Sequence, residues 1–148
     1  MKKFSFKLET LLQYRTNIEE KERLALSRLN FMLQAEIGQR ERLRAIERET
    51  LAQLTLERSG AGQEAESRWY YPYLDRLRLE IERSSLRITN LEKEVDAQKL
   101  VVIEASKKKK VLDTLKTKRV KEFTAAVEKQ EQKAVDEIVV TRYAHKES

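Results

Sequence analysis

The sequence predicts an all-α fold, a long antiparallel two-helix coiled-coil hairpin, and three observations support that prediction. First, the stretch from residue 73 to residue 143 contains neither proline nor glycine. Second, the same stretch carries apolar residues at alternating steps of three and four, which is the 3.5-residue spacing of a coiled coil. Third, the 148 residues include only three glycines and one proline, while 38% are charged. That composition is typical of long helices and not of loop-rich globular domains.

The first predicted helix covers about residues 5–58, and Ser5 is a suitable N-cap residue. Polar residues interrupt its apolar stripe at Arg15, at Glu22 and at Gln39 or Arg40. Polar residues in a seam lower the stability of a coiled coil and often fix its register. Steps of three and four connect most of the apolar residues, which are Phe4, Leu8, Leu11, Leu12, Ile18, Ala25, Leu26, Leu29, Met32, Leu33, Ile37, Leu43, Ile46, Leu51 and Leu54.

The turn is predicted at about residues 59–71. It opens with Ser59, Gly60, Ala61 and Gly62, and Gly60 can take the left-handed conformation that closes a helix. Pro72 fits the first turn of a helix and disfavours helical geometry at the preceding residue, Tyr71. The second helix therefore begins at Pro72, or earlier near Glu64 with a kink at Pro72.

The second predicted helix covers about residues 72–143 and carries the more regular stripe. Near Leu112 the register is expected to shift, because the step of three to Leu115 is typical of a stammer. We expect Phe123, Ala126 and Val140 to continue the heptad only irregularly. Nine of the twelve seam positions before this point are apolar, and the twelve are Leu74, Leu77, Ile81, Ser84, Ile88, Leu91, Val95, Gln98, Val102, Ala105, Lys109 and Leu112.

Two long helices joined by a short turn run antiparallel, so we expect one elongated domain over residues 1–148. Pairing outward from the turn places Phe4 opposite roughly residue 127. The second helix would then extend past the first from Glu128 onward. This overhang holds apolar residues without an intramolecular partner, which suggests a surface for another protein: Val135, Ile138, Val139 and Val140.

Catalytic and metal sites are not predicted. The chain has no cysteine, its one histidine, His145, lies in a polar tail, and its carboxylates are spread over helix faces. We therefore expect no enzyme, no cofactor and no small-molecule substrate. No apolar run approaches the ~18 residues of a membrane helix, and the basic N-terminus lacks the apolar region of a secretory signal. A soluble protein compatible with a reducing cytoplasm is expected.

Basic charge is concentrated toward the C-terminus. The whole chain has a net charge of +6, and residues 107–148 carry 12 basic and 7 acidic side chains, a net charge of +5. Residues 107–110 are four consecutive lysines that wrap around the helix, with Lys109 at a seam position. Because no aromatic residue or docking motif accompanies them, a solvated or partner-facing role is favoured over nucleic acid or anionic lipid.

An aromatic cluster lies between the two helices. Trp69, Tyr70, Tyr71 and Tyr73 fall within five residues. These rings can close the end of the hairpin by packing, or they can form a binding patch, since aromatic residues dominate interaction hot spots. The sequence leaves both interpretations open.

Three motifs follow one another along essentially the whole chain. The first is the spacing of Phe4, Phe6, Leu8, Leu11, Leu12 and Arg15 before a Glu-rich stretch. The second is Trp69 followed by Tyr73, Leu74, Leu77 and Ile81. The third is the group Glu131, Gln132, Lys133, Asp136 and Glu137. Together and in this order, the three motifs resemble those of the flagellar FliJ family, although Pro72 departs from the family pattern.

This resemblance implies a non-enzymatic component of the flagellar type III export apparatus, whose fold is similar to the central stalk (gamma) subunit of rotary ATPases. The implied partners are the hexameric export ATPase and its regulator, the membrane export gate protein and export chaperones. The implied location is the cytoplasm, with peripheral association at the inner face of the cell membrane at the flagellar base.

The resemblance and the two exposed ends together assign two sets of contact residues. For the export gate, at the turn end, the set is Trp69, Tyr70, Tyr73, Leu74, Leu77 and Ile81. For the ATPase ring, at the end with the termini, the set is Phe4, Phe6, Glu131, Gln132, Asp136, Glu137, Ile138 and Val140. Two alternatives stay open: a coiled-coil structural or nucleic-acid-associated protein, and the equivalent stalk protein of a virulence type III secretion system, which would have the same architecture.

Overall fold

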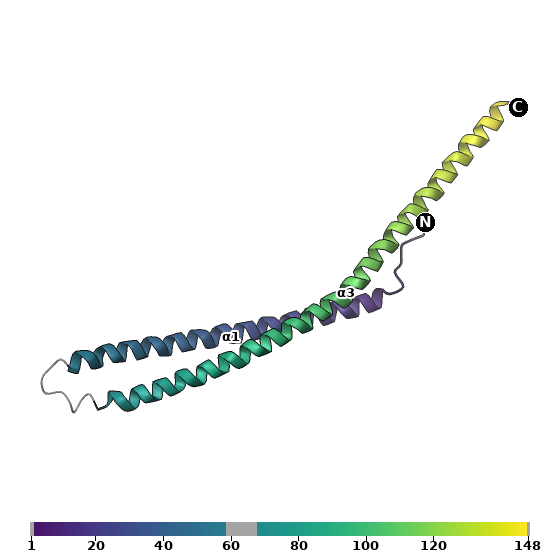
Figure 1. The fold of residues 1–148 in the computed structure, drawn as a ribbon. Helices are drawn as coiled ribbons and strands as arrows, with labels where there is room; N and C mark the ends of the chain where they lie inside the picture. The colour runs from purple at the N-terminus through teal and green to yellow at the C-terminus, as the bar shows by residue number, and fades with distance from the viewer. Residues whose placement is uncertain (1, 59–67, 148) are drawn as a thin grey trace. The chain divides into compact units, whose positions relative to one another are not determined.

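The computed structural model describes residues 2–58 and 68–147, which form two long helices that pack against each other (Figure 1). Helix α1 comprises Glu9–Arg58 and helix α3 comprises Tyr70–Glu147. The described ranges contain no β-strand, so the predicted all-α hairpin is confirmed. The predicted break at Ser59 to Gly62 lies outside the described residues. Neither helix, over the residues described, has a stretch apolar enough to span a lipid bilayer.

The start of α1 differs from the prediction. Ser5 is exposed and lies before a turn at Lys7 and Leu8, so it is not the N-cap of α1. The backbone N–H of Glu9 donates a hydrogen bond to the carbonyl of Phe6 at 3.1 Å. Phe4 and Phe6 are half-buried on either side of the exposed Ser5, which is the alternation of an extended segment. Burial of these two rings thus replaces the predicted first turn of helix.

Helix α3 begins at Tyr70, two residues before Pro72, and continues to Glu147. The prediction that Tyr71 takes an extended conformation was therefore wrong. A proline in the first helical turn removes an N–H that has no partner within the helix, so its cost there is small. The restriction that proline places on the preceding residue is a preference, and here the helix overrides it.

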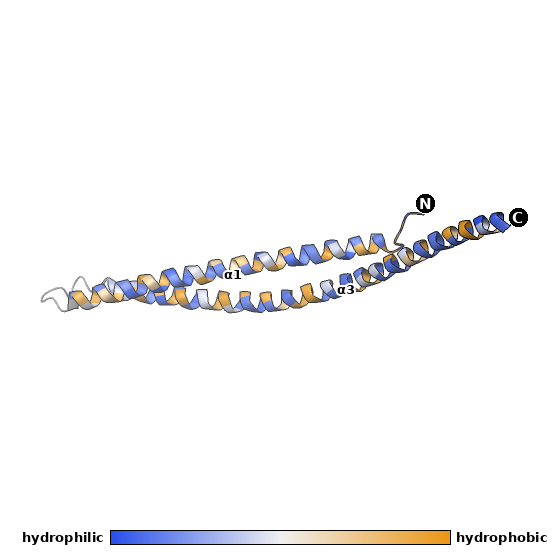
Figure 2. Ribbon diagram, turned by 90° about the horizontal axis from the view of Figure 1, so that it is seen from above, coloured by the Kyte–Doolittle hydropathy of each residue, from blue (hydrophilic) through white to orange (hydrophobic). Residues whose placement is uncertain are grey.

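The chain divides into two compact units. The first unit combines Met1–Glu20 with Glu104–Ser148, and the second is Lys21–Ile103. In the second unit, Leu33, Ile88 and Val95 form a buried cluster, against which Leu26, Leu29, Ile37 and Leu91 pack. Apolar residues alternate with hydrophilic ones along both helices (Figure 2). The core of this unit is a seam between two helices.

Contacts within the second unit run antiparallel. The Tyr70 hydroxyl, at the start of α3, lies 3.1 Å from the Glu57 carboxylate, near the end of α1. Farther along α3, the side-chain amide of Gln98 donates hydrogen bonds to the Glu22 carboxylate at 2.6 Å and to the Glu22 carbonyl at 3.0 Å. Residue numbers rise along α3 as those of the partners fall along α1, as predicted for a hairpin.

The predicted stripe of α3 is confirmed, because all twelve of its seam positions are buried or half-buried. Most predicted apolar positions of α1 are also buried or half-buried. The exceptions are Leu8, Leu11, Met32 and Ile46, which are 37–52% exposed. The stripe is therefore narrower on α1 than the count of apolar residues predicted.

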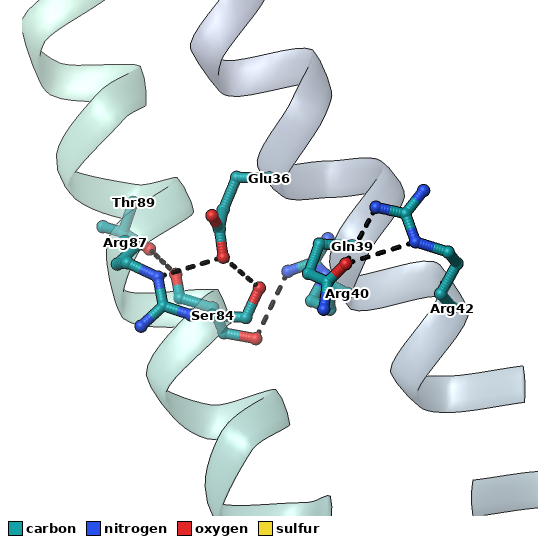
Figure 3. A network of polar contacts seen from close by, with 8 residues as sticks. Glu36, Gln39, Arg40, Arg42, Ser84, Arg87 and Thr89 are labelled. Atoms are coloured by element: carbon teal, nitrogen blue, oxygen red, sulfur yellow. Dashed lines mark hydrogen bonds and ion pairs between the residues drawn. The ribbon is translucent and has the colours of Figure 1, made fainter. Parts of the chain in front are cut away.

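One polar residue in the seam, Ser84, takes part in a network of hydrogen bonds between the two helices (Figure 3). Ser84 is fully buried, and its hydroxyl donates a 2.7 Å hydrogen bond to Glu36 Oε1. Arg87 Nε donates to the same oxygen at 3.0 Å. The Ser84 hydrogen bond lowers the pKa of Glu36 below its ordinary value of 4.5, against the opposing effect of burial, and the bond and charge of Arg87 lower it further.

The Glu36→Gln change is expected to lower the melting temperature at neutral pH and to have less effect as the pH falls. Because the pKa of Glu36 is lower in the folded than in the unfolded chain, its carboxylate stabilises the fold fully above the unfolded-state value. That contribution is lost as the pH falls through the folded-state value. Thermal unfolding followed by circular dichroism, from about pH 7 to about pH 3, measures the difference between the two proteins.

The matched control is Glu41→Gln. Glu41 pairs with Arg44 one turn away on the same helix, and both side chains are well exposed, at 57% and 42%. Its removal should change the melting temperature little at any pH. A Glu36→Gln difference that stays constant down to the acid limit would show that the Ser84 and Arg87 contacts do not depend on the charge of Glu36.

Candidate functional site

The N-terminal segment and α3 form a groove in the first unit. The rings of Phe4 and Phe123 lie with their centroids 5.7 Å apart and tilted by 59°, a favourable geometry for an aromatic pair. The groove has a volume of about 830 Å³. Its lining combines apolar side chains with mostly cationic ones, and the residues are Lys2, Lys3, Phe4, Ser5, Phe6, Lys7, Leu8, Leu115, Arg119, Glu122 and Phe123.

Two lysines of α3 pair with carboxylates of α1 in the same unit. Lys109 Nζ lies 3.8 Å from the buried Glu19, and Lys116 Nζ lies 2.9 Å from Glu9. Lys109, Lys116 and Phe123 follow one another at steps of seven, and all three are half-buried. Every second seam position thus stays in the register past Leu112, but the positions between them, Arg119 and Ala126, are exposed, while Leu115 is half-buried. The predicted irregularity after Leu112 is therefore confirmed in part. Counting apolar residues missed the positions that stay in register because a lysine occupies a seam position in two successive heptads.

Beyond the groove, the last part of α3 is exposed. Val127 is half-buried, and every residue from 128 to 147 is exposed, as the pairing argument predicted. The end of α3 extends past the N-terminal segment (Figure 1). Val135, Ile138, Val139 and Val140 are 53–66% exposed. We call residues 128–147 the overhang.

The predicted ATPase-contact residues fall into two groups. Six lie exposed on the overhang: Glu131, Gln132, Asp136, Glu137, Ile138 and Val140. The Gln132 side chain donates a 3.1 Å hydrogen bond to Asp136, one turn away. Phe4 and Phe6 instead line the groove. Both groups belong to the first unit.

The aromatic cluster in the second unit is also divided. Trp69 is 82% exposed and Tyr73 44%, and both line a hollow of about 390 Å³ with Arg68, Pro72 and Arg76. Tyr70 is half-buried against α1 through its contact with Glu57. The packing interpretation therefore describes Tyr70, while Trp69 and Tyr73 retain the surface that a binding patch requires.

Three other residues of the predicted gate-contact set lie in the seam. Leu74 and Leu77 are only 3% and 6% exposed, and Ile81 is half-buried. A partner that approaches the closed pair of helices reaches Trp69 and Tyr73 before it reaches these three side chains.

Sequence reasoning overlooked some exposed apolar residues outside the stripe. Phe31, Leu86 and Leu100 are 76%, 62% and 68% exposed. These residues could have been recognised from the sequence, because each is apolar at a position that the 3.5-residue spacing places on the solvent-facing side of the helix. Over residues 2–58 and 68–147, no group of three or more histidine or acidic side chains could hold a metal ion.

Comparison with known proteins gave one match. A protein-family model described as "Flagellar FliJ protein" matches residues 4–148, nearly the entire chain. No curated protein and no solved structure gave a significant match.

Proposed function

Because the chain belongs to the flagellar FliJ protein family, whose role lies in flagellar protein export, we propose that it is a stalk-like adaptor between the hexameric export ATPase complex and the membrane export gate. In this role it carries no enzymatic activity. It contacts the ATPase and its regulator, handles export chaperones, and associates with the inner face of the cell membrane through its partners.

The exposed overhang is the observation that carries this proposal. Residues 128–147 are helical and every one of them is exposed, and Ile138, Val139 and Val140 are large apolar side chains among them. An isolated helix in water is only marginally stable, and exposed apolar side chains favour a partner. A single helix about 10–12 Å in diameter with its side chains is also suited to enter the centre of a ring. We assign the overhang to the ATPase.

The turn end supplies the second contact. We assign Trp69 and Tyr73 to the export gate, because they are the exposed members of the predicted set and aromatic residues dominate interaction hot spots. Arg68 and Arg76 flank the same hollow, so the patch joins aromatic and cationic side chains, both of which are enriched in protein interfaces.

Replacing both Trp69 and Tyr73 with alanine is expected to weaken gate binding at least about 10-fold, because two exposed hot-spot side chains are lost. The helical content should stay unchanged, since neither ring is buried. Isothermal titration calorimetry with the purified gate protein measures the affinity, and circular dichroism measures the helix.

Leu86→Ala is the matched control, because Leu86 is an exposed apolar residue on the same helix. It should leave gate binding within about twofold of the unchanged protein. Equal loss of helicity and affinity in the double variant would favour a packing role for both rings. Unchanged affinity with intact helix would remove Trp69 and Tyr73 from the gate contact.

The flagellar family match favours this function over the equivalent stalk protein of a virulence secretion system. The two would share the same architecture, so the genes that neighbour this one provide an independent check.

A further inference from the structure

Six of the seven lysines of α3 from residue 107 to residue 121 lie on two different faces. Lys109 and Lys116 point into the seam, where they pair with Glu19 and Glu9 at 3.8 and 2.9 Å. The other side of the helix carries Lys107, Lys110, Lys118 and Lys121, all exposed. We call these four residues the lysine stripe.

Helix geometry places the lysine stripe opposite the seam. At about 100° per residue, the four lysines fall within an arc of about 80°. Lys107 and Lys110 are repeated by Lys118 and Lys121 eleven residues later, which is about three turns, so the stripe is about 21 Å long. Of the four consecutive lysines, Lys109 is paired with α1, and the exposed Lys108 lies about 80° from the edge of the stripe, so only Lys107 and Lys110 belong to it.

The positive charge of the lysine stripe is not neutralised within the described chain. None of its four lysines has an ion-pair partner among residues 2–58 and 68–147. Asp113, the one carboxylate of this stretch, and Glu122, which follows it, lie toward the flanks of the stripe. Glu122 pairs with Arg119 at 3.6 Å.

The same face of the helix carries the exposed residues Val111, Thr114 and Thr117 between these lysines. No aromatic or arginine side chain lies among them. Protein interfaces concentrate affinity in Trp, Tyr and Arg, and nucleic-acid surfaces add aromatic stacking to their positive charge. A lysine, in contrast, lays its apolar stem along a surface and keeps its ammonium group hydrated.

We propose that the lysine stripe binds an anionic phospholipid surface directly. A membrane surface is broad and negatively charged, so all four ammonium groups can approach it together, and each adds to the attraction. This inference goes beyond the adaptor role, in which the membrane is reached only through partner proteins. The stripe ends at Lys121, before the overhang begins at residue 128, so the two surfaces use different residues.

The test is vesicle sedimentation of the full-length protein. The vesicles contain phosphatidylcholine alone, or about 70% phosphatidylcholine and 30% phosphatidylglycerol. The unchanged protein should bind the anionic vesicles, and binding should weaken as salt rises from about 50 to about 500 mM, because screening shortens the range of the attraction. Changing all four stripe lysines to glutamine should lower the partition coefficient by about 100-fold or more. Glutamine preserves helix propensity.

A variant with equal net charge separates the lysine stripe from overall charge. It replaces Lys21, Lys93, Lys99 and Lys133, all exposed, with glutamine, and it should bind within about threefold of the unchanged protein. An equal loss in both variants, or equal binding to neutral vesicles, would overturn the proposal.

Nucleic acid is the alternative anionic partner. Filter binding with single-stranded RNA and with duplex DNA, at the same two salt concentrations, tests it. Tighter binding to either nucleic acid than to vesicles, through the same four lysines, would replace the membrane assignment. The vesicle assay contains no ATPase or gate protein, so a negative result there leaves the adaptor proposal unaffected.

Discussion

Ending the chain at Val127 is expected to abolish binding to the hexameric export ATPase and to leave the paired helices intact. The removed residues include the exposed aliphatic side chains of the overhang, Val135, Ile138, Val139 and Val140. All of the removed residues that the structure describes are exposed, whereas Val127 is half-buried and is kept. Biolayer interferometry with the ATPase measures binding, and circular dichroism measures helicity and the melting temperature.

Point variants give the same test without shortening the chain. Val140→Asp places a charge on the proposed interface, at a residue that is 66% exposed. Leu86→Asp is its control, since Leu86 is 62% exposed and lies outside the overhang. We expect at least about a 10-fold loss of ATPase affinity for the first and less than about twofold for the second. Normal binding by the shortened chain would show that the ATPase contact lies elsewhere.

Ile88→Ala is expected to destabilise the second unit by about 2–4 kcal/mol, because it removes a buried side chain and leaves a cavity. Ile88 is 3% exposed and belongs to the cluster with Leu33 and Val95. A loss of this size is a large part of the total stability of a protein. Urea unfolding followed by circular dichroism measures it through the transition midpoint.

Leu86→Ala, two residues away on the same helix, is the control. Leu86 is 62% exposed, so its truncation should cost less than about 0.5 kcal/mol. A similar loss for both variants would mean that burial in the seam does not determine the stability of this unit.

The apolar stripe of α3, which packs in the seam, could be predicted because it depends only on the spacing of residues within one helix. A 3.5-residue period places all of its members on one face, whatever the partner is. The contacts across the seam could not be predicted in the same way. The bonds from Ser84 to Glu36 and from Lys116 to Glu9 depend on how far one helix is shifted along the other. A turn of uncertain length fixes that shift only to within several residues.

Of the candidate surfaces, the overhang could be predicted from the sequence, whereas the exposed part of the gate-contact set and the N-terminal groove could not. The overhang follows from helix lengths alone, so the sequence predicts it from Glu128 to the expected helix end near residue 143. The helix instead continues to Glu147. Leu74, Leu77 and Ile81 were assigned to the gate by resemblance, although the heptad count also places them in the seam. The structure assigns them to the seam by burial. The N-terminal groove was missed because an extended segment with Phe4 and Phe6 gives the same apolar count as the first turn of a helix.

The thin seam also affects how stability depends on temperature. Only nine apolar residues are buried over the described ranges, one of them an alanine. Heat capacity rises on unfolding mainly because apolar surface becomes exposed to water. A chain that buries little such surface has a small heat-capacity change per residue, so its free energy of unfolding varies gradually with temperature. Its hydrophobic stabilisation therefore weakens less on cooling than that of a compact domain of equal length.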